Sequence, residues 1–423
     1  MLGFKKDLYD YYFRYIMAEN NKIFSLLAEH TQWRTKECIN LIPSENAASP
    51  QVLKLLGSDL SNRYTLNMNT KIHNVFIKNA YGGTKFTDAI ETETEEVCKS
   101  VFNAKYCTVK PLSGHIAGLV MLLAVCSPKD WILIIHADHG GYDGYMPDYM
   151  PKFLNLEVDY LPFLETEWNV DSEAAAKKIR EGKPRLVILG ASFILYPYDI
   201  KPMREACDEV DAILGYDGSH VLGLIGGGEF QKPLLEGVDI VTGSTHKTLF
   251  GPQGGLIITN REDLFKNVSS KLTWYTIDNA HQNRIAALGQ ALLEIKEFGG
   301  AYAKQVISNS KALAAALDDS GIHVKFKNKN YTESHQVLLN IDQIESEYNI
   351  NSMELSNRLE AENIIIDAVG RLGTNEMTRR GCKEEDMVTI AQFVKRVVVD
   401  KEKMVKNDVI NFLKGFDLEY CFK

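Results

Sequence analysis

Residues 239–255 read DIVTGSTHKTLFGPQGG, an apolar run that gives way to small polar residues, a lysine and a cluster of glycines. The apolar start predicts a buried strand, and Lys247 follows directly after its end. Burial among small residues lowers the pKa of a lysine amine and makes it a candidate for Schiff-base formation. The glycines would let the backbone approach a ligand closely. A surface turn is the alternative interpretation of this stretch.

Short apolar runs of the same kind occupy the middle of the chain, and helical patterns separate them. They read YCTVKP (106–111), DWILIIHA (130–137), RLVILGAS (185–192), DAILGYDG (211–218), DIVTGSTH (239–246) and GGLIIT (254–259). Near-continuous apolar strands that alternate with helices are typical of βαβ units and of a buried, mostly parallel sheet. We therefore expect an α/β fold, with ligand-binding residues at the carboxyl ends of the strands.

The two ends of the chain have different patterns. A long helical pattern spans about residues 280–320, and strand-like HQVLLNID (335–342) and NIIIDA (363–368) precede a terminal helix. We expect these last residues to form a smaller α+β domain. The first fifty residues or so are helical in pattern and rich in aromatic side chains, which would pack on their own core or on a partner subunit. The expected division is 1–50, 51–290 and 291–423.

Composition excludes some classes of function. The chain has 47 basic and 56 acidic residues, a net charge of −9, and it lacks the basic clusters that a general nucleic-acid binder needs. The 45% hydrophobic and 24% charged fractions are those of an ordinary soluble protein. We therefore expect no nucleic-acid partner.

Cysteine usage and apolar segments indicate a cytoplasmic protein. The seven cysteines are scattered without a C-x-x-C pair, which favours reduced thiols over disulfides and predicts no metal site. The longest apolar stretch, residues 116–126, is shorter than the roughly 20 residues that cross a bilayer. The N-terminus is interrupted by charges, unlike a signal peptide.

Three other places after apolar runs carry polar residues suited to a ligand. Ser113-Gly114-His115 opens a helical pattern and would offer N–H groups to an anion, although a plain helix N-cap explains the same residues. Asp217 would pair with a protonated ring nitrogen, or it would be a turn residue. Arg371 would bind a carboxylate, unless it is an ordinary surface arginine.

The order of these residues is more informative than any one of them. An anion cradle, an acid, a lysine and a distant arginine, in that sequence along an α/β chain, form the set that pyridoxal phosphate chemistry on an amino acid needs. They would hold the phosphate, keep the ring nitrogen protonated, form the Schiff base and bind the substrate carboxylate.

On these residues the chain resembles the serine hydroxymethyltransferase family, which has the aspartate-aminotransferase-like fold, pyridoxal phosphate fold type I. Within the family it resembles an archaeal-type or a threonine-transaldolase-like member. The resemblance covers about residues 40–390, and its motifs are LIPSEN (41–46), NRY (62–64), YGG (81–83), SGH (113–115), YDGSHVLGLI (216–225), GSTHKTLFGPQGG (243–255), YTESHQV (331–337) and RLGTNEMTRRGCKEEDM (371–387).

The resemblance implies a role for each matching residue. Lys247 would form the Schiff base, and Asp217 would pair with the ring nitrogen; His220, Tyr64 and Tyr142 would take part in catalysis. The cofactor-binding residues would be Ser113, Gly114, His115, Tyr142, Ser192, Asp217, His220, Thr245, His246, Lys247 and Gly255. The substrate-binding residues would be Ser44, Tyr64, Tyr81 and Arg371.

The resemblance also implies a homodimer with shared active sites. Tyr64 and Tyr81 match family tyrosines that reach into the site of the neighbouring subunit. On this interpretation residues 1–50 are a dimerisation arm, residues 51–290 the large cofactor-binding domain and residues 291–423 the small domain.

Two departures from the family pattern bear on function: Leu66 with the longer segment after it, and Tyr142. Leu66 replaces the glutamate that handles protons when the one-carbon unit passes to folate, and leucine cannot act as an acid or base. The segment that follows, NMNTKIHNVFIKNA (67–80), is longer than in the family, and as a long loop it could bring in His73. Tyr142 replaces a histidine that stacks on the cofactor ring, and a tyrosine can still stack there. Gln253 stands where many members have arginine, but archaeal-type members share that change.

These departures predict retro-aldol and aldol chemistry at the Cα–Cβ bond of a β-hydroxy-α-amino acid without folate. The enzyme would be an aldolase, or a transaldolase that passes the glycyl unit to another aldehyde. One alternative is a true serine hydroxymethyltransferase that uses tetrahydrofolate or a modified pterin. Another is a pyridoxal phosphate-binding protein without turnover.

Overall fold

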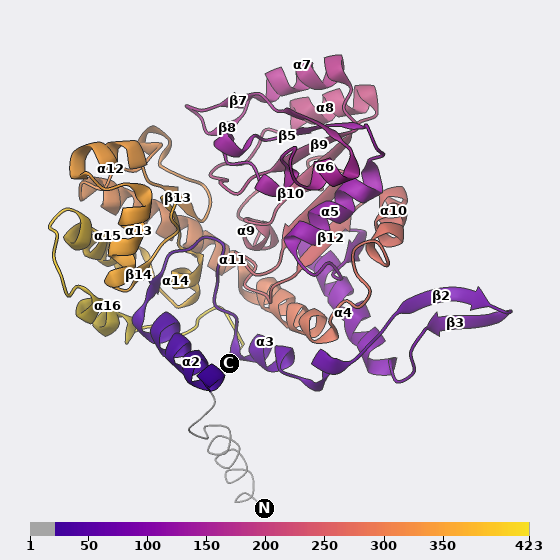
Figure 1. The fold of residues 1–423 in the computed structure, drawn as a ribbon, viewed down its shortest axis with the longest axis horizontal. Coiled ribbons are helices and arrows are strands. Elements are labelled where there is room, and N and C mark those ends of the chain that lie inside the picture. The colour runs from indigo at the N-terminus through magenta and orange to yellow at the C-terminus, as the bar shows by residue number, and fades with distance from the viewer. Residues whose placement is uncertain (1–21, 423) are drawn as a thin grey trace, which may run out of the picture.

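A seven-stranded sheet forms the centre of the larger part of the molecule (Figure 1). The structure is a computed structural model that describes residues 22–422. In spatial order the strands are β4 (Tyr106–Thr108), β12 (Gly255–Thr259), β11 (Ile240–Ser244), β10 (Ile213–Asp217), β9 (Leu186–Gly190), β5 (Trp131–Ile134) and β6 (Glu157–Tyr160). All the predicted apolar runs form strands, and the edge strand β6 was not predicted.

The direction of the strands brings their carboxyl ends together. β11, β10, β9, β5 and β6 pair in parallel, and only β12 runs against its two neighbours in this sheet. β4 therefore points the same way as β11, although the two are not adjacent. The prediction of a mostly parallel sheet is confirmed, and one edge of the sheet collects the residues that follow its parallel strands.

Helices cover the sheet. α5 (Gly114–Val125) is apolar on all sides and mostly buried, because it packs between strands β10 to β12 and α10 (Glu262–Leu272). The other helices of this part are α4 (Lys85–Phe102), α6 (Met150–Leu154), α7 (Ser172–Gly182), α8 (Lys201–Val210) and α9 (Leu222–Gly226). The short elements are β7 (Phe163–Leu164), β8 (Asn169–Val170) and the helical turns η3 (Ala137–His139) and η4 (Asp143–Tyr145).

The long helix α11 (Gln282–Asp319) joins two hydrophobic cores. It contributes residues up to Val306 to the core around the large sheet, and residues from Leu313 onward to a second core near the C-terminus. The predicted boundary between residues 290 and 291 lies inside this helix. The predicted helical pattern at about 280–320 is confirmed.

The second core combines the C-terminal residues with part of the N-terminal segment. Its elements are β13 (Gln336–Leu338), α12 (Ile341–Tyr348), α13 (Ser352–Ala361), β14 (Ile364–Ile365), β15 (Arg371–Gly373), α14 (Asn375–Arg379), α15 (Glu384–Val398), α16 (Lys406–Leu413) and the turn η5 (Lys327–Lys329). β1 (Ile39–Asn40) pairs in parallel with β14, and Ile39 and Leu41 are fully buried there. Residues 39–41 of the proposed arm thus belong to this core.

The rest of the N-terminal region is more exposed. α2 (Lys22–Gln32) has no buried residue, and the helical turn η1 (Trp33–Glu37) that follows packs beside α16. The arm prediction for residues 1–21 lies outside the described residues. α3 (Pro50–Leu56) and the turn η2 (Asp59–Asn62) connect the segment to the large sheet part.

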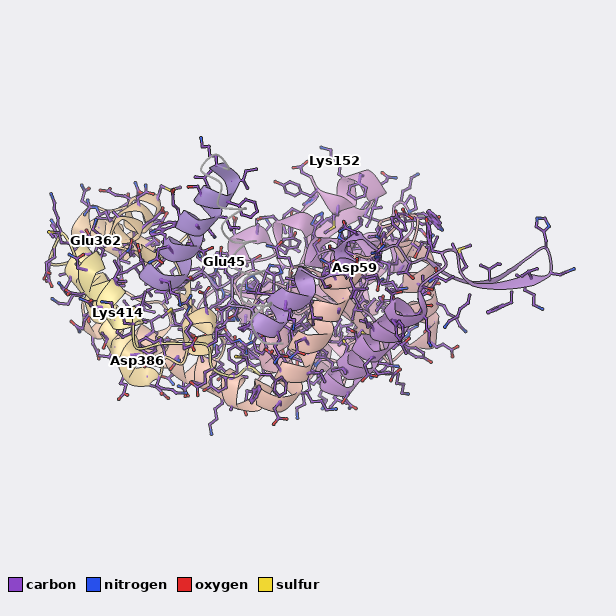
Figure 2. The ribbon with its side chains drawn as sticks, turned by 90° about the horizontal axis from the view of Figure 1, so that it is seen from below. Glu45, Asp59, Lys152, Glu362, Asp386 and Lys414 are labelled. Carbon is purple, nitrogen blue, oxygen red and sulfur yellow. The ribbon has the colours of Figure 1, made fainter. Side chains whose placement is uncertain are left out.

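The segment expected as a long loop is a β-hairpin. β2 (Asn67–Ile72) and β3 (Val75–Asn79) pair antiparallel and project from one end of the molecule in both views (Figures 1 and 2). The two turn residues, His73 and Asn74, have φ of 48° and 68°, the left-handed conformation that tight hairpin turns require. Val75 and Phe76, next to the turn, are each 60% exposed.

Within residues 22–422, no helix combines the length and apolar character that a membrane crossing requires.

Candidate active site

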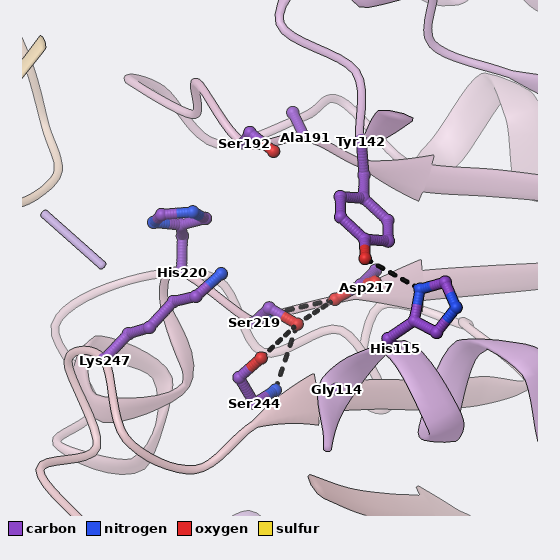
Figure 3. A pocket seen from close by; sticks show the side chains of 10 residues that line it. All are labelled: Gly114, His115, Tyr142, Ala191, Ser192, Asp217, Ser219, His220, Ser244 and Lys247. Carbon is purple, nitrogen blue, oxygen red and sulfur yellow. Dashed lines mark hydrogen bonds between the residues drawn. The ribbon is translucent and has the colours of Figure 1, made fainter. Parts of the chain in front are cut away.

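A cavity of about 60 Å³ opens at the carboxyl edge of the large sheet (Figure 3). Its lining residues come from the segments that follow β4, β5, β9, β10 and β11, as the strand directions require. They are Gly114, His115, Tyr142, Ala191, Ser192, Asp217, Ser219, His220, Ser244 and Lys247. Seven of the residues singled out in the sequence therefore meet in one place.

Asp217, the last residue of β10, is held by three donors. The Tyr145 hydroxyl donates to Oδ2 at 2.9 Å, and the Ser219 amide and hydroxyl donate to Oδ1 at 3.0 and 2.5 Å. Burial, and then the charge of Asp217, raises the pKa of Tyr145 well above its usual value, so this hydroxyl keeps its proton and remains a donor. These bonds fix the direction in which the carboxylate faces the cavity.

Lys247 lies in the loop after β11, and its amine end points into the cavity below the ring of His220 (Figure 3). Burial lowers the pKa of this amine to about 8; the charge of Asp217 opposes the shift and that of Arg371 adds to it. The main-chain carbonyl of Lys247 accepts a 2.8 Å hydrogen bond from the amide of Asn46. The main chain of Lys247 is therefore held in place by Asn46, and its amine is easier to deprotonate than that of a surface lysine.

The N-terminus of α5 forms one wall of the cavity. The Ser113 hydroxyl accepts a hydrogen bond from the Ile116 amide at 3.1 Å, so this side chain caps the helix. A plain helix N-cap is one of the two interpretations of Ser113-Gly114-His115. A Cβ on Gly114 would lie 2.2 Å from the Ser244 hydroxyl, and one on Gly255 would lie 2.3 Å from the Ser113 carbonyl. Both glycines are thus needed for close packing of the helix start against β11 and β12.

Aromatic and imidazole groups line the remaining walls. The Tyr142 hydroxyl is 2.9 Å from Nδ1 of His115. Burial and the charges of Asp217 and Asp143 raise the pKa of Tyr142, so it faces the cavity as a neutral phenol. His220 lies on the opposite side in Figure 3, and burial lowers its pKa well below the usual value.

Arg371 lies behind the cavity. On β15, it donates through Nε to Asp367 at 2.9 Å and through Nη1 to the carbonyl of Ser192, and its guanidinium stacks 4.6 Å from the ring centre of Phe193. Among the described residues its charge is thus paired with Asp367, and it reaches the cavity through the Ser192 main chain.

Other predicted residues lie outside this cavity. Ser44 and His246 line a second, larger cavity of about 800 Å³ between the N-terminal segment and the C-terminal elements. Thr245 turns its hydroxyl back to the carbonyl of Pro252 at 2.7 Å. Tyr64 and Tyr81 are exposed beside the β2–β3 hairpin, with ring centres 5.0 Å apart.

Sequence inspection missed several residues of the site. Ser219 and Ser244 could have been found, because they are close to Asp217 and Lys247 at the same strand ends. Asn46 lies in LIPSEN and Gln336 in YTESHQV, but neither motif indicates what these two side chains contact. Tyr145 has no sequence signal that separates it from the other tyrosines.

The groups in this cavity fit pyridoxal phosphate. A helix N-terminus with free N–H groups suits the phosphate, a buried carboxylate suits the protonated ring nitrogen, and a lysine with a lowered pKa suits the aldehyde. Within residues 22–422, no cluster of three or more histidine, cysteine, aspartate or glutamate side chains is arranged to hold a metal ion.

Comparison with known proteins gives a consistent result. The family model described as "Serine hydroxymethyltransferase" matches residues 16–394. The serine hydroxymethyltransferase of Staphylothermus marinus is 39% identical over 418 residues, which cover 96% of this chain and 94% of the relative. That of Methanocaldococcus jannaschii is 39% identical over 405 residues, 92% of each chain.

A solved structure has the same fold. The crystal structure of L-threonine transaldolase from Pseudomonas fluorescens, in its internal aldimine state, matches with a TM-score of 0.85 at 27% sequence identity. The match covers 100% of this chain and 96% of the transaldolase. The fold is therefore that of the pyridoxal phosphate enzymes of fold type I, the chain is an enzyme, and its cofactor is pyridoxal phosphate. The chain belongs to the serine hydroxymethyltransferase family.

Proposed function

We propose that this enzyme breaks and forms the Cα–Cβ bond of a β-hydroxy-α-amino acid without folate. Family membership and the transaldolase fold support pyridoxal phosphate-dependent chemistry at that bond. The independence from folate is carried by one observation. On the resemblance to the family, Leu66 stands at the position of the proton-transferring glutamate, just before the β2–β3 hairpin, whose segment is longer than in the family pattern.

Two carboxylates next to the hairpin, Asp88 and Glu91, are engaged in holding it, which does not favour them as substitutes for that glutamate. The amide of Asn79 donates to Asp88 at 3.0 Å, and the amide of Asn67 donates to Glu91 at 2.9 Å. Asp88 and Glu91 of α4 thus each hold one strand of the hairpin. His73 stands in the turn at the far end of the hairpin. Leu66 itself offers no proton to a substrate.

The main residues of the cavity have roles in this proposal. When bound, pyridoxal phosphate would stabilise the electron pair that remains at Cα after a bond to it breaks. Lys247 would hold the cofactor covalently, and the N–H groups at the start of α5 would bind its phosphate. Asp217 would pair with the ring nitrogen and keep it protonated.

The remaining residues bind and orient the substrate. The ring of Tyr142 would stack on the cofactor ring, and Ser192 and His220, which line the same cavity, would flank the phenolic oxygen of the cofactor. Arg371 binds the amino-acid carboxylate together with Ser44, in exchange for its present bond to the Ser192 carbonyl. Holding the carboxylate sets which bond at Cα is aligned for cleavage.

We further propose a homodimer in which each site takes Tyr64 and Tyr81 from the other chain. Both tyrosines are exposed and line neither cavity of their own chain. They flank the hairpin. Its exposed apolar side chains, Val75 and Phe76, would become buried against a second copy of the chain. We also propose a cytoplasmic location, because the seven cysteines are scattered without a C-x-x-C pair, which favours reduced thiols.

A folate-dependent hydroxymethyltransferase is the second candidate. Three relatives that cover more than nine tenths of this chain carry the name serine hydroxymethyltransferase. A hydroxymethyl transfer needs a carrier for the one-carbon unit, which in this second candidate would be tetrahydrofolate or a modified pterin. In that case a residue other than Leu66 would move the proton.

The two candidates differ in a single assay. Purified enzyme is incubated with L-serine, with and without tetrahydrofolate, and with glycine plus a series of aldehydes. The proposal predicts new β-hydroxy-α-amino acids from glycine and aldehydes, and glycine formation from serine that tetrahydrofolate does not accelerate. Turnover that requires tetrahydrofolate and ignores every aldehyde would establish the second candidate. No turnover of any amino acid, in protein that binds the cofactor, would contradict both.

A further inference from the structure

A buried glutamine of β13 bonds to two loops next to the cavity, the one after β9 and the one after β10. Gln336, the first residue of β13, is fully buried. Its side-chain oxygen accepts the Ile194 amide at 3.0 Å, and its nitrogen donates to the Ser192 carbonyl at 3.0 Å. The same nitrogen lies 3.0 Å from Nδ1 of His220. The C-terminal part of the fold thereby touches a residue of the cavity.

The backbone partners fix which end of the glutamine is the donor. A main-chain N–H only donates and a main-chain carbonyl only accepts, so the Ile194 amide must meet the oxygen and the Ser192 carbonyl must meet the nitrogen. The second hydrogen of the nitrogen is then directed at His220. Because Gln336 supplies the hydrogen, Nδ1 of His220 accepts it, and a neutral imidazole must carry its own hydrogen on Nε2.

We propose that Gln336 is a positioning residue that holds His220 as the neutral Nε2–H tautomer, so that this imidazole presents only a donor to the cavity. The inference rests on the proposed function in one respect, the contact of His220 with cofactor or substrate. An oxygen that develops negative charge in the cavity then meets a fixed N–H group. Gln336 itself touches neither ligand.

His335 approaches the same nitrogen. Its Nε2 is 3.4 Å from Nδ1 of His220, and the two rings meet nearly edge to edge, with centres 5.6 Å apart and 19° between the planes. This contact is longer than the 3.0 Å bond from Gln336, whose donor end is fixed by its two main-chain partners. A hydrogen on Nδ1 directed at His335 would lie against the hydrogen that Gln336 already points at that nitrogen.

Protonation of His220 to the cation is opposed from every side. Burial is the largest cause that lowers its pKa, and the charges of Lys247 and Arg371 act in the same direction, as would His335 and His246 if they were protonated. Burial also lowers the pKa of His335 to about 3 and that of His246 to about 4, so both are neutral near pH 7. Because the cation is disfavoured, the tautomer alone determines whether His220 presents a hydrogen-bond donor or an acceptor to the cavity.

The test reads the tautomer directly. Holoenzyme labelled with nitrogen-15 in its histidines is examined by NMR through the long-range couplings of the ring, and His220 is assigned from the signal lost in His220→Asn. The expected wild-type pattern is a bare Nδ1 and a protonated Nε2. In Gln336→Glu the new carboxylate accepts, so the hydrogen moves to Nδ1; in Gln336→Met both tautomers appear.

Activity and pH dependence give the second readout. The expected loss in kcat for Gln336→Glu is about 100-fold, with KM changed much less, because the donor in the cavity is lost. The added carboxylate favours the imidazolium and moves the acid limb of the pH profile upward. Gln392→Glu, the same change at an exposed position of α15, is the matched control and should behave as wild type.

The outcomes separate this inference from the proposed function. A hydrogen on Nδ1 in the wild-type spectrum overturns it, and so does an unchanged tautomer in both Gln336 variants, whatever their activity. If Gln336→Glu fails to fold, the spectra of the wild type and of Gln336→Met still show whether Gln336 determines the tautomer of His220. The expected spectra in an enzyme that needs tetrahydrofolate would leave this inference standing while the folate-independent reaction fails.

Discussion

The side-chain amide of Asn46 donates a 2.8 Å hydrogen bond to the main-chain carbonyl of Lys247, 201 residues further along the chain. The same nitrogen contacts the hydroxyl of the buried Tyr302 at 2.9 Å. Asn46 comes from the N-terminal segment whose residues 39–41 pack in the second core. The lysine loop is therefore held between two parts of the fold.

Replacing Asn46 with alanine should lower both stability and activity. The carbonyl of Lys247 loses its partner, which costs about 1–3 kcal/mol of the free energy of unfolding if it remains buried. The loop then has more freedom, so kcat should fall. Denaturant unfolding and steady-state kinetics measure the two effects.

A matched variant distinguishes loss of positioning from loss of stability. The amide of Asn283 donates to the carbonyl of Leu56 at 2.8 Å, outside both cavities. Asn283→Ala should lose similar stability and keep its kcat. Equal kinetic losses in the two variants would show that the bond to Lys247 has no special role.

The buried amine of Lys247 should destabilise the folded state of the cofactor-free protein. Its pKa is lowered from 10.5 to about 8, which corresponds to roughly 3 kcal/mol against the charged form. Lys247→Met removes this penalty, so the variant should be inactive yet more stable at pH 7 by about 2–3 kcal/mol.

The pH dependence of that difference has a definite sign. Between pH 8 and 10.5 the unfolded chain binds a proton at this lysine and the folded chain does not, so the wild type gains stability as the pH rises. The advantage of Lys247→Met should be complete below pH 8 and vanish towards pH 10.5. Unfolding curves of both cofactor-free proteins across this range measure it, and a constant difference would contradict a lowered pKa.

Removing the Asp217 carboxylate and removing its donor Tyr145 should give graded losses of activity. Asp217→Asn removes the charge that faces the ring nitrogen and should reduce kcat by about 1000-fold with the fold retained. Tyr145→Phe removes one donor and should cost about 1 kcal/mol of stability and less than about tenfold in kcat. If Tyr145→Phe were as inactive as Asp217→Asn, the hydroxyl would have a role beyond orienting the carboxylate.

Mixed dimers test the shared site. Lys247→Ala and Tyr64→Phe should each reduce activity strongly, because every site would combine Lys247 of one chain with Tyr64 of the other. Unfolding and refolding the two together should restore about a quarter of the wild-type activity, since half the dimers then hold one intact site. Activity that stays at the level of the separate variants would place both residues in the same chain's site.

The sequence predicted the strands and the residues at their ends because both depend on local patterns. Apolar runs identify buried strands, and parallel strands end at one edge, so Asp217, Ser192 and Lys247 could be expected to meet. The sequence could not show that β12 runs against its neighbours, since direction depends on which strand it pairs with. β6 escaped prediction because EVDY alternates apolar and acidic residues at the edge of the sheet.

The residues that orient the site were not predictable, because they come from far along the chain. Gln336 is 116 residues from His220, and Tyr145 is 72 residues from Asp217. No local pattern reports such contacts. The hairpin had a signal that was missed: His73 and Asn74 stand between β-branched and aromatic residues, and asparagine tolerates the left-handed turn.

Release of glycine and acetaldehyde from L-threonine, in buffer that contains no folate, measures the proposed bond cleavage itself. The wild-type enzyme should release the two products in equal amounts, and Lys247→Ala should release neither. If L-threonine is inert, and glycine forms only from L-serine after tetrahydrofolate is added, the enzyme depends on folate and the proposed reaction is wrong.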